Sequence, residues 1–174
     1  SGATFAYDGN CWEDPCAARL TLTPRSGHVV AALDGALYAV GGAHFGDRCA
    51  LVERFCTEGS SIHGRWQEVA PMQVARTFHA VAVLEGYLYA IGGATNDGLG
   101  GERATNSVER YCPMWDYWEF VASMCTARRQ FGAVVCGGVI YAVGGLGTRG
   151  VEMFCLKRGL WTPCAPLPPN TSSG

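Results

Sequence analysis

The sequence is poor in charge and has no long apolar run. Charged residues make up 16% of the 174 residues and the formal net charge is −2, whereas an average soluble domain has roughly 25% charged residues. A near-neutral chain has no electrostatic footprint for nucleic acid or for an anionic membrane. No apolar run approaches the roughly 20 residues of a transmembrane helix, and residues 1–4 lack the basic and apolar regions of a signal peptide. We therefore expect neither a nucleic acid nor a membrane as partner.

Signatures of catalysis and of metal binding are also missing. The sequence contains no GxSxG nucleophile elbow, no HExxH zinc motif and no GxxxxGK[ST] phosphate loop. None of its nine cysteines lies in a CxxC pair, although a zinc site usually draws its four ligands from two close pairs. The sequence therefore predicts no enzyme, no catalytic residue, no metal and no cofactor. We expect the thiols to be free and reduced, in a cytoplasmic protein.

Glycine, by contrast, is abundant and falls at regular intervals. The chain has 24 glycines, about twice the average share of roughly 7%. Because a glycine inside a helix costs about 1 kcal/mol, a helical bundle is disfavoured. Double glycines begin at Gly41, Gly92 and Gly144, and in each case an arginine stands 16 residues earlier. These intervals indicate three copies of a unit of about 50 residues.

Each copy contains four short apolar segments in the same order. Two runs such as VVAAL and ALYAV flank a two-residue turn and end at the double glycine. A third run with a Val-Glu pair follows, and then a tryptophan. Four short strands in about 50 residues are typical of one blade of a β-propeller. The near-continuous apolar character of the first two runs predicts strands that are buried on both faces. The turns, which need positive φ at both positions, are Asp34-Gly35, Glu85-Gly86 and Gly137-Gly138.

The full pattern resembles the kelch repeat of animal kelch-like proteins. Its elements are Arg-x-x-His/Phe, the hairpin, Tyr-Ala-Val/Ile-Gly-Gly, Val-Glu-x-Phe/Tyr and the tryptophan, and they recur over nearly the whole chain. The resemblance implies an all-β fold, a kelch-type β-propeller arc of three full four-stranded blades plus the outer half of a fourth. One departure is a cysteine (Cys56, Cys112, Cys155) where the family usually has aspartate. The expected segments are 1–23 (outer strands of a partial blade and a linker), 24–74, 75–126 and 127–168 (three kelch repeats), and 169–174 (a tail).

Three blades do not close a ring, and an open arc exposes apolar faces that invite association. Three alternatives remain at this point. The chain is a piece of a larger propeller with about six blades, two copies of the arc join into one ring, or a partner chain caps the arc. The first residue is not Met, which favours a piece of a longer protein.

Comparison of the copies separates scaffold from candidate site. A residue that recurs in every copy is needed by each blade, whereas a residue found once in a loop is a better candidate for function. By this criterion the turn cysteines are structural, and the recurring histidines are packed side chains rather than bases. The other recurring residues assigned to the scaffold are Arg25, Arg76, Arg128, Glu53, Glu109 and Glu152, and the histidines are His28 and His79.

The resemblance implies that ligands bind on one face, formed by the loops between strands two and three and by the connections between blades. Arg128, Arg129 and Arg149 would make the rim of the third blade basic, and arginine suits a carboxylate ligand. An acidic peptide is therefore one expectation, and the alternative is that these are ordinary solvated charges. The candidate partner-binding residues are Ser26, Gly27, His44, Phe45, Arg48, Thr77, Phe78, Asn96, Asp97, Arg129, Gln130 and Arg149.

The function implied by the resemblance is protein–protein interaction, with recruitment of substrates to a cullin-based ubiquitin ligase. That activity would need a BTB or other adaptor domain outside this chain. The remaining blades would come from the rest of the protein or from a second copy. The alternatives are an actin-binding kelch scaffold and, less favoured, a kelch-fold enzyme such as a copper oxidase, which needs a Tyr, His and Cys constellation.

Overall fold

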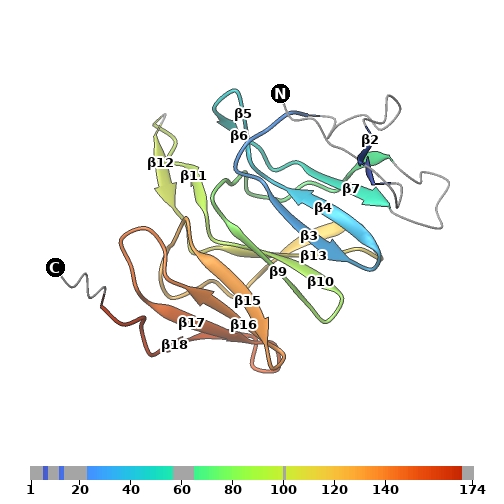
Figure 1. Cartoon of the computed structure of the whole chain (residues 1–174). Coiled ribbons are helices and arrows are strands. Elements are labelled where there is room, and N and C mark those ends of the chain that lie inside the picture. Colours follow the sequence, from blue (N-terminus) through green and yellow to red (C-terminus); the bar gives the residue numbers. More distant parts are fainter. Residues whose placement is uncertain (1–5, 8–11, 14–22, 57–64, 100, 170–174) are drawn as a thin grey trace.

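Three four-stranded antiparallel sheets lie side by side in an arc (Figure 1). The computed structural model describes residues 6–7, 12–13, 23–56, 65–99 and 101–169. Within each sheet the strands follow one another in chain order, so each sheet is one blade. The blades are β3 (Val29–Leu33), β4 (Ala36–Val40), β7 (Val52–Cys56) and β8 (Trp66–Val69); β9 (Ala80–Leu84), β10 (Tyr87–Ile91), β13 (Val108–Cys112) and β14 (Tyr117–Val121); and β15 (Gly132–Cys136), β16 (Val139–Val143), β17 (Val151–Cys155) and β18 (Leu160–Cys164).

Three small two-stranded sheets complete the described structure. Two of them are hairpins inserted between the second and third strands of the first two blades. The third pairs Tyr7 with Trp12, as expected for the outer half of a preceding blade, although Phe5 and residues 8–11 lie outside the described residues. No helix in the described part of the chain is long and apolar enough to cross a membrane. The small sheets are β5 (Ala43–His44) with β6 (Asp47–Arg48), β11 (Ala94–Asn96) with β12 (Glu102–Ala104), and β1 (Ala6–Tyr7) with β2 (Trp12–Glu13).

The tight turns between the first two strands of each blade adopt the expected conformation. Asp34 and Gly35 have φ values of 49° and 71°, and Gly137 and Gly138 have values of 59° and 74°. Positive φ at both positions matches the twist of a two-residue hairpin. Each turn therefore sets the register of its two strands, for example Leu33 opposite Ala36.

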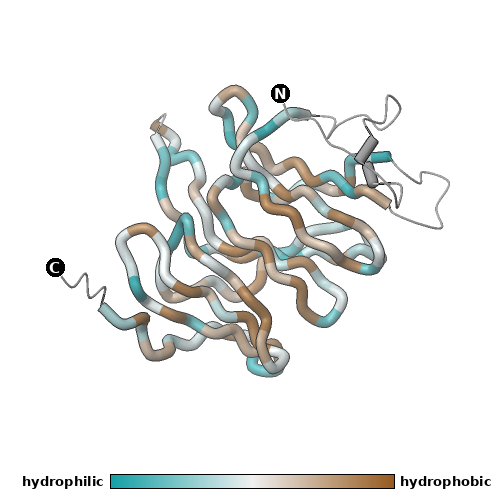
Figure 2. Tube along the Cα trace, viewed as in Figure 1, coloured by the Kyte–Doolittle hydropathy of each residue, from teal (hydrophilic) through white to brown (hydrophobic). Residues whose placement is uncertain are grey.

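The core lies between the blades rather than within one sheet. Alternate residues of β9 point to opposite neighbours: Val81 and Val83 pack on the first blade, whereas Ala82 and Leu84 pack on the third. Hydrophobic colour follows the inner strands of all three sheets in Figure 2. Each blade thus buries one face against the next, as a propeller requires.

The prediction that the first two strands of each blade are buried on both faces holds in the second blade and in β4, and it is wrong for β3 and β15, the first strands of the blades at the two ends of the arc. Val30 on β3 and Val134 on β15 are both exposed. Their neighbours along each strand, such as Ala31 and Ala133, pack on the second blade. β3 and β15 therefore show period-two burial, because within the described residues only one of their faces packs on a neighbouring blade.

Candidate functional site

A buried ion pair holds each connection between blades in place. Arg76 donates from Nη2 to Oε1 of Glu109 (2.6 Å) and from Nη1 to the carbonyl of Gly92 (2.8 Å). Glu109 also accepts the backbone N–H groups of Gln73 (2.5 Å) and Val74 (3.1 Å). Burial lowers the pKa of Arg76, and the nearby charge of Glu109 opposes this shift. The pair therefore joins β13, the end of β10 and the incoming connection.

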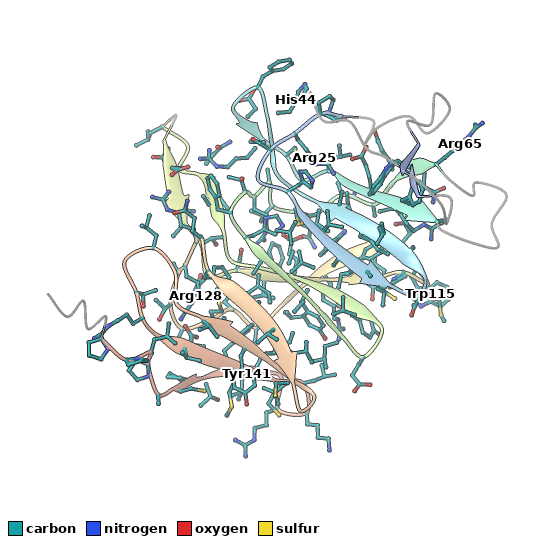
Figure 3. All side chains as sticks on the ribbon, viewed as in Figure 1. Arg25, His44, Arg65, Trp115, Arg128 and Tyr141 are labelled. Carbon is teal, nitrogen blue, oxygen red and sulfur yellow. The ribbon has the colours of Figure 1, made fainter. Side chains whose placement is uncertain are left out.

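The other two blades repeat this ion pair. Arg128 contacts Glu152 at 2.6 Å, and Arg25 contacts Glu53. Burial raises the pKa of Glu152. Hydrogen bonds from Arg128 and from two backbone N–H groups lower this pKa by more than burial raises it, so the net shift is downward. The prediction that these residues are scaffold is confirmed. The expectation that Arg128 contributes to a basic rim is wrong, because its side chain is completely buried in this pair (Figure 3).

The connections between blades and the loops between strands two and three meet at one end of the sheets. Ala43 N–H donates to the carbonyl of Ser26 (2.8 Å), and Ala94 N–H donates to the carbonyl of Thr77 (2.7 Å). In the third blade Leu146 N–H donates to the carbonyl of Arg129 (3.0 Å). We call this end of the arc the loop face, defined as residues 24–28, 43–48, 75–78, 94–99, 101–104, 127–130 and 146–150.

Neighbouring connections also contact one another across the loop face. Gln130 N–H donates to the carbonyl of Phe78 (2.9 Å), and Oγ1 of Thr77 donates to the carbonyl of Gly27 (3.4 Å). The structure thus brings together all six candidate residues from the connections. They form a continuous platform: Ser26, Gly27, Thr77, Phe78, Arg129 and Gln130.

Above the platform, the carboxylate of Glu102 bridges arginines from two other blades. Glu102 pairs with Arg48 of β6 and with Arg129 of the third blade, and Arg48 also donates to Oδ1 of Asn96 (2.6 Å). Three candidate residues therefore meet, but their positive charge is partly neutralised. Glu102 was not among the predicted site residues, because its partners lie 54 and 27 residues away in other blades and no sequence pattern pairs such positions.

The remaining candidates divide between internal contacts and exposed side chains. Oδ1 of Asp97 accepts the N–H groups of Leu99 (2.8 Å) and Gly101 (2.9 Å), which lower the pKa of this carboxyl. Asp97 thus shapes the loop between β11 and β12. Nδ1 of His44 lies 2.5 Å from the carbonyl of Pro24, and His44 sits at the edge of the loop face in Figure 3. Arg149 is exposed.

Four apolar side chains are exposed on the loop face. Phe45 and Leu99, at the tips of the two hairpins, are 96% and 93% exposed, Leu146 is 60% exposed and Phe78 is 42% exposed. Leu99 and Leu146 were not among the sequence candidates. Their signal was a large apolar residue next to glycine in a loop, because Gly98 precedes Leu99 and Gly147 follows Leu146.

Beneath the platform lies a buried, uncharged histidine. His79 is 4% exposed, and its ring lies against the backbone of the first blade at Val40 and Gly41. Burial lowers the pKa of His79 to about 3, and the positive charges of Arg76 and His28 lower it too. The recurring histidine at this position is therefore packed, as predicted, and is not a base at neutral pH.

Replacing His79 by Phe is expected to remove part of the acid sensitivity of the fold. The unfolded state binds a proton near pH 6.5 and the folded state only near pH 3, so stability present above about pH 6.5 is lost as the pH falls. The loss on going from about pH 7 to about pH 5 is about 2 kcal/mol. Phe131 occupies the equivalent position in the third blade, so the substitution fits the scaffold. Urea unfolding of both proteins at the two pH values measures the difference, and parallel losses of stability would contradict it.

Cysteines and potential metal ligands form no further site in the part of the chain that the structure describes. Its seven cysteines are free, whereas Cys11 and Cys16 lie outside it. No group of three or more His, Cys, Asp or Glu residues in this part could hold a metal ion.

Comparison with known proteins agrees with the geometry. The Kelch motif matches residues 24–73, 75–124 and 127–168. The chain is 37% identical over 109 residues to Kelch-like ECH-associated protein 1B of Danio rerio, covering 63% of this chain and 18% of that protein. It is 33% identical over 136 residues to Kelch-like protein 35 of Mus musculus (69% and 23%) and 30% identical over 164 residues to Kelch-like protein 26 of Mus musculus (90% and 26%). The matched part is thus 18% to 26% of each relative's length.

A solved structure supports the fold independently. The structure titled "Structure of YjhT" superposes with a TM-score of 0.75 at 16% sequence identity, covering 87% of this chain and 54% of that one. At this identity the likeness concerns the fold alone. With three matched motifs, three blades and a buried Arg–Glu pair in each blade, the chain belongs to the Kelch motif family.

Proposed function

We propose that the chain is a protein-interaction module that binds a peptide or protein segment on its loop face. The observation that carries this proposal is the platform of six connection residues, which are held by backbone hydrogen bonds and by the hydroxyl of Thr77 and are surrounded by loops that differ between blades. A rigid base with variable loops is a common arrangement for binding sites. The exposed apolar side chains around the platform add contact area for a partner.

Substitution of Ser26 by Trp tests the position of this site. Ser26 is exposed on the platform, so an indole there should block docking and leave the blades folded. Peptides selected from a random library against the immobilised chain would be measured by fluorescence polarisation. We expect at least about tenfold weaker binding to the variant. Lys157→Trp, in the turn between β17 and β18 at the opposite end, is the matched control. Equal binding to both variants would place the site elsewhere.

The finer proposal is that this face recruits substrates to a cullin-based ubiquitin ligase in the cytoplasm. It is supported by the similarity to kelch-like proteins, and the seven free cysteines are compatible with a reducing compartment. The adaptor domain would lie in another part of a longer protein. The alternative function is an actin-binding scaffold. It predicts that the chain cosediments with actin filaments, which a module that binds other protein partners would not do.

An acidic ligand would be recognised through Arg129 and Arg149. For such a ligand the double substitution Arg129→Ala/Arg149→Ala should weaken binding by about tenfold or more, because each arginine donates charge-assisted hydrogen bonds. Binding should also weaken as salt concentration rises. Arg158→Ala, an exposed arginine in the turn at the opposite end, is the control. Binding that is unchanged in both tests would contradict an acidic ligand.

A further inference from the structure

The third blade differs from the other two along one row of residues that crosses its sheet. The row consists of four residues that lie directly opposite one another on adjacent strands. In the first two blades it reads Ala-Tyr-Arg followed by Gln or Glu, whereas in the third blade it reads Val-Tyr-Met-Thr, without a charge. The rows are Ala31, Tyr38, Arg54 and Gln67; Ala82, Tyr89, Arg110 and Glu119; and Val134, Tyr141, Met153 and Thr162.

In the first two blades this row faces the next blade of the arc. The ring of Tyr38 lies 5.8 Å from that of Tyr111 in the second blade, and the ring of Tyr89 lies 5.9 Å from that of Phe154 in the third blade. Arg110 belongs to the same row as Tyr89, and its charge is paired within its own sheet. A junction between two blades of this arc therefore accommodates an arginine in the row, and its replacement by methionine is not needed for blade packing.

The row of the third blade lies on an open face at one end of the arc (Figure 1). Ala133 and Val135 pack on the second blade, so the alternate residues of β15 and the corresponding residues of β16–β18 point away from it. Val134 is 55% exposed and Leu160 is 44% exposed. None of the residues on this face is charged. Besides the row itself, they are Gly132, Cys136, Val139, Val143, Val151, Cys155, Leu160 and Cys164.

We propose that this open face of the third blade binds the same face of a second copy of the chain. In a two-fold contact each residue lies beside its own equivalent in the partner. Tyr141 (labelled in Figure 3) and Met153 occupy the centre of the face, so an arginine in the row would oppose itself there, and like charges in an interface are unfavourable. Methionine removes this conflict, and a face without charges is complementary to itself. The contact uses no residue of the loop face and does not depend on the proposed function.

The size of the face determines how strong this contact should be. Four strands spaced about 4.8 Å apart, with five residues each at about 3.3 Å per residue, form a face of about 19 by 17 Å. Two such sheets would pack about 10 Å apart, with their side chains in contact. A contact of this area belongs to the small interfaces that form weak, reversible complexes. We therefore expect a dimer that forms as the protein concentration rises.

Sedimentation equilibrium of the 174-residue chain tests the dimer. The mass should rise from 18.5 kDa towards twice that value with increasing concentration. Met153→Arg should weaken dimerisation by about tenfold or more, because two guanidinium groups would meet at the centre of the contact. The urea midpoint should change little, since Arg54 and Arg110 occupy the equivalent positions of the other blades. Val30→Arg is the matched control, because Val30 is 52% exposed on the open face of the first blade.

A mixture of two variants distinguishes a two-fold contact from other arrangements. Met153→Arg and Met153→Glu should each be monomeric, and an equimolar mixture should regain the dimer, because position 153 of one copy then meets the opposite charge in the other. A chain that stays monomeric at all concentrations would overturn the proposal, and so would a dimer that Met153→Arg leaves intact. Loss of the dimer in Val30→Arg, or a mixture that stays monomeric, would also overturn it, since the third blade would then pack on the first blade of the other copy.

Discussion

Replacing Glu109 by Gln is expected to lower the free energy of unfolding by about 3–5 kcal/mol. The carboxylate is completely buried, pairs with Arg76 and accepts two backbone N–H groups. An amide of the same size leaves the guanidinium of Arg76 as a buried charge without a counter-charge. Its NH2 group can also face a backbone N–H, so that a donor meets a donor. Urea titration followed by tryptophan fluorescence would measure the loss.

Glu119→Gln is the matched control in the same blade. Glu119 also pairs with an arginine, Arg110, but its side chain is 38% exposed. An ion pair that is open to water contributes about 0–1 kcal/mol, so this variant should unfold close to the original midpoint. Arg76→Met combined with Glu109→Gln should recover part of the stability, because the unpaired charge is then gone. Similar losses for Glu109→Gln and Glu119→Gln would contradict the importance of burial.

Gly92→Ala is expected to destabilise the fold by about 2–4 kcal/mol, from backbone strain together with steric overlap. Gly92 has φ of +57°, and a β-carbon there would lie 2.8 Å from the carbonyl oxygen of Arg128 and 3.0 Å from Cε of Met124. That carbonyl accepts the N–H of Gly93 at 2.9 Å. It therefore cannot move away without loosening the contact between the second and third blades, and the platform residue Arg129 would shift with it.

Gly86→Ala separates the contribution of backbone strain to the loss of stability from the contribution of steric overlap. Gly86 also has positive φ, +76°, but no atom lies within 4 Å of a β-carbon built on it. This variant should lose only the conformational part, about 1 kcal/mol. The two variants would be compared by urea unfolding under the same conditions. If Gly92→Ala lost no more stability than Gly86→Ala, the close approach between the blades would not be rigid.

Most of the fold could be predicted from consecutive residues. The turns Asp34-Gly35 and Gly137-Gly138 determine where the first two strands meet, and the structure has positive φ at all four positions. The recurring arginines and glutamates could be assigned to the scaffold because each blade needs them. The exposure of Val30 and Val134 could not be predicted. The hydrophobic pattern of an apolar run is the same whether or not a neighbouring blade covers the second face of the strand.

Less of the candidate site could be predicted. The loops and connections were placed on one face correctly, and the six platform residues do come together. The charge of that face was overestimated, because Arg128 is buried and Glu102 neutralises part of the charge of Arg48 and Arg129. The exposed Leu99 and Leu146 were missed, since an apolar residue in a loop does not reveal from the sequence whether it is covered.

The sequence by itself determined the repeat, the blade, the turns and the residues that every blade shares. These properties depend on local periodicity and on backbone preferences of neighbouring residues, which are visible in any one copy. Only the tertiary structure decided which loop residues meet. Glu102 pairs with Arg48 and Arg129, which lie 54 and 27 positions away in the chain. Phe78 adopts positive φ in a connection that forms hydrogen bonds with both of the other blades. Such contacts are set by how blades pack on one another, because packing brings together side chains whose positions in the chain carry no common signal.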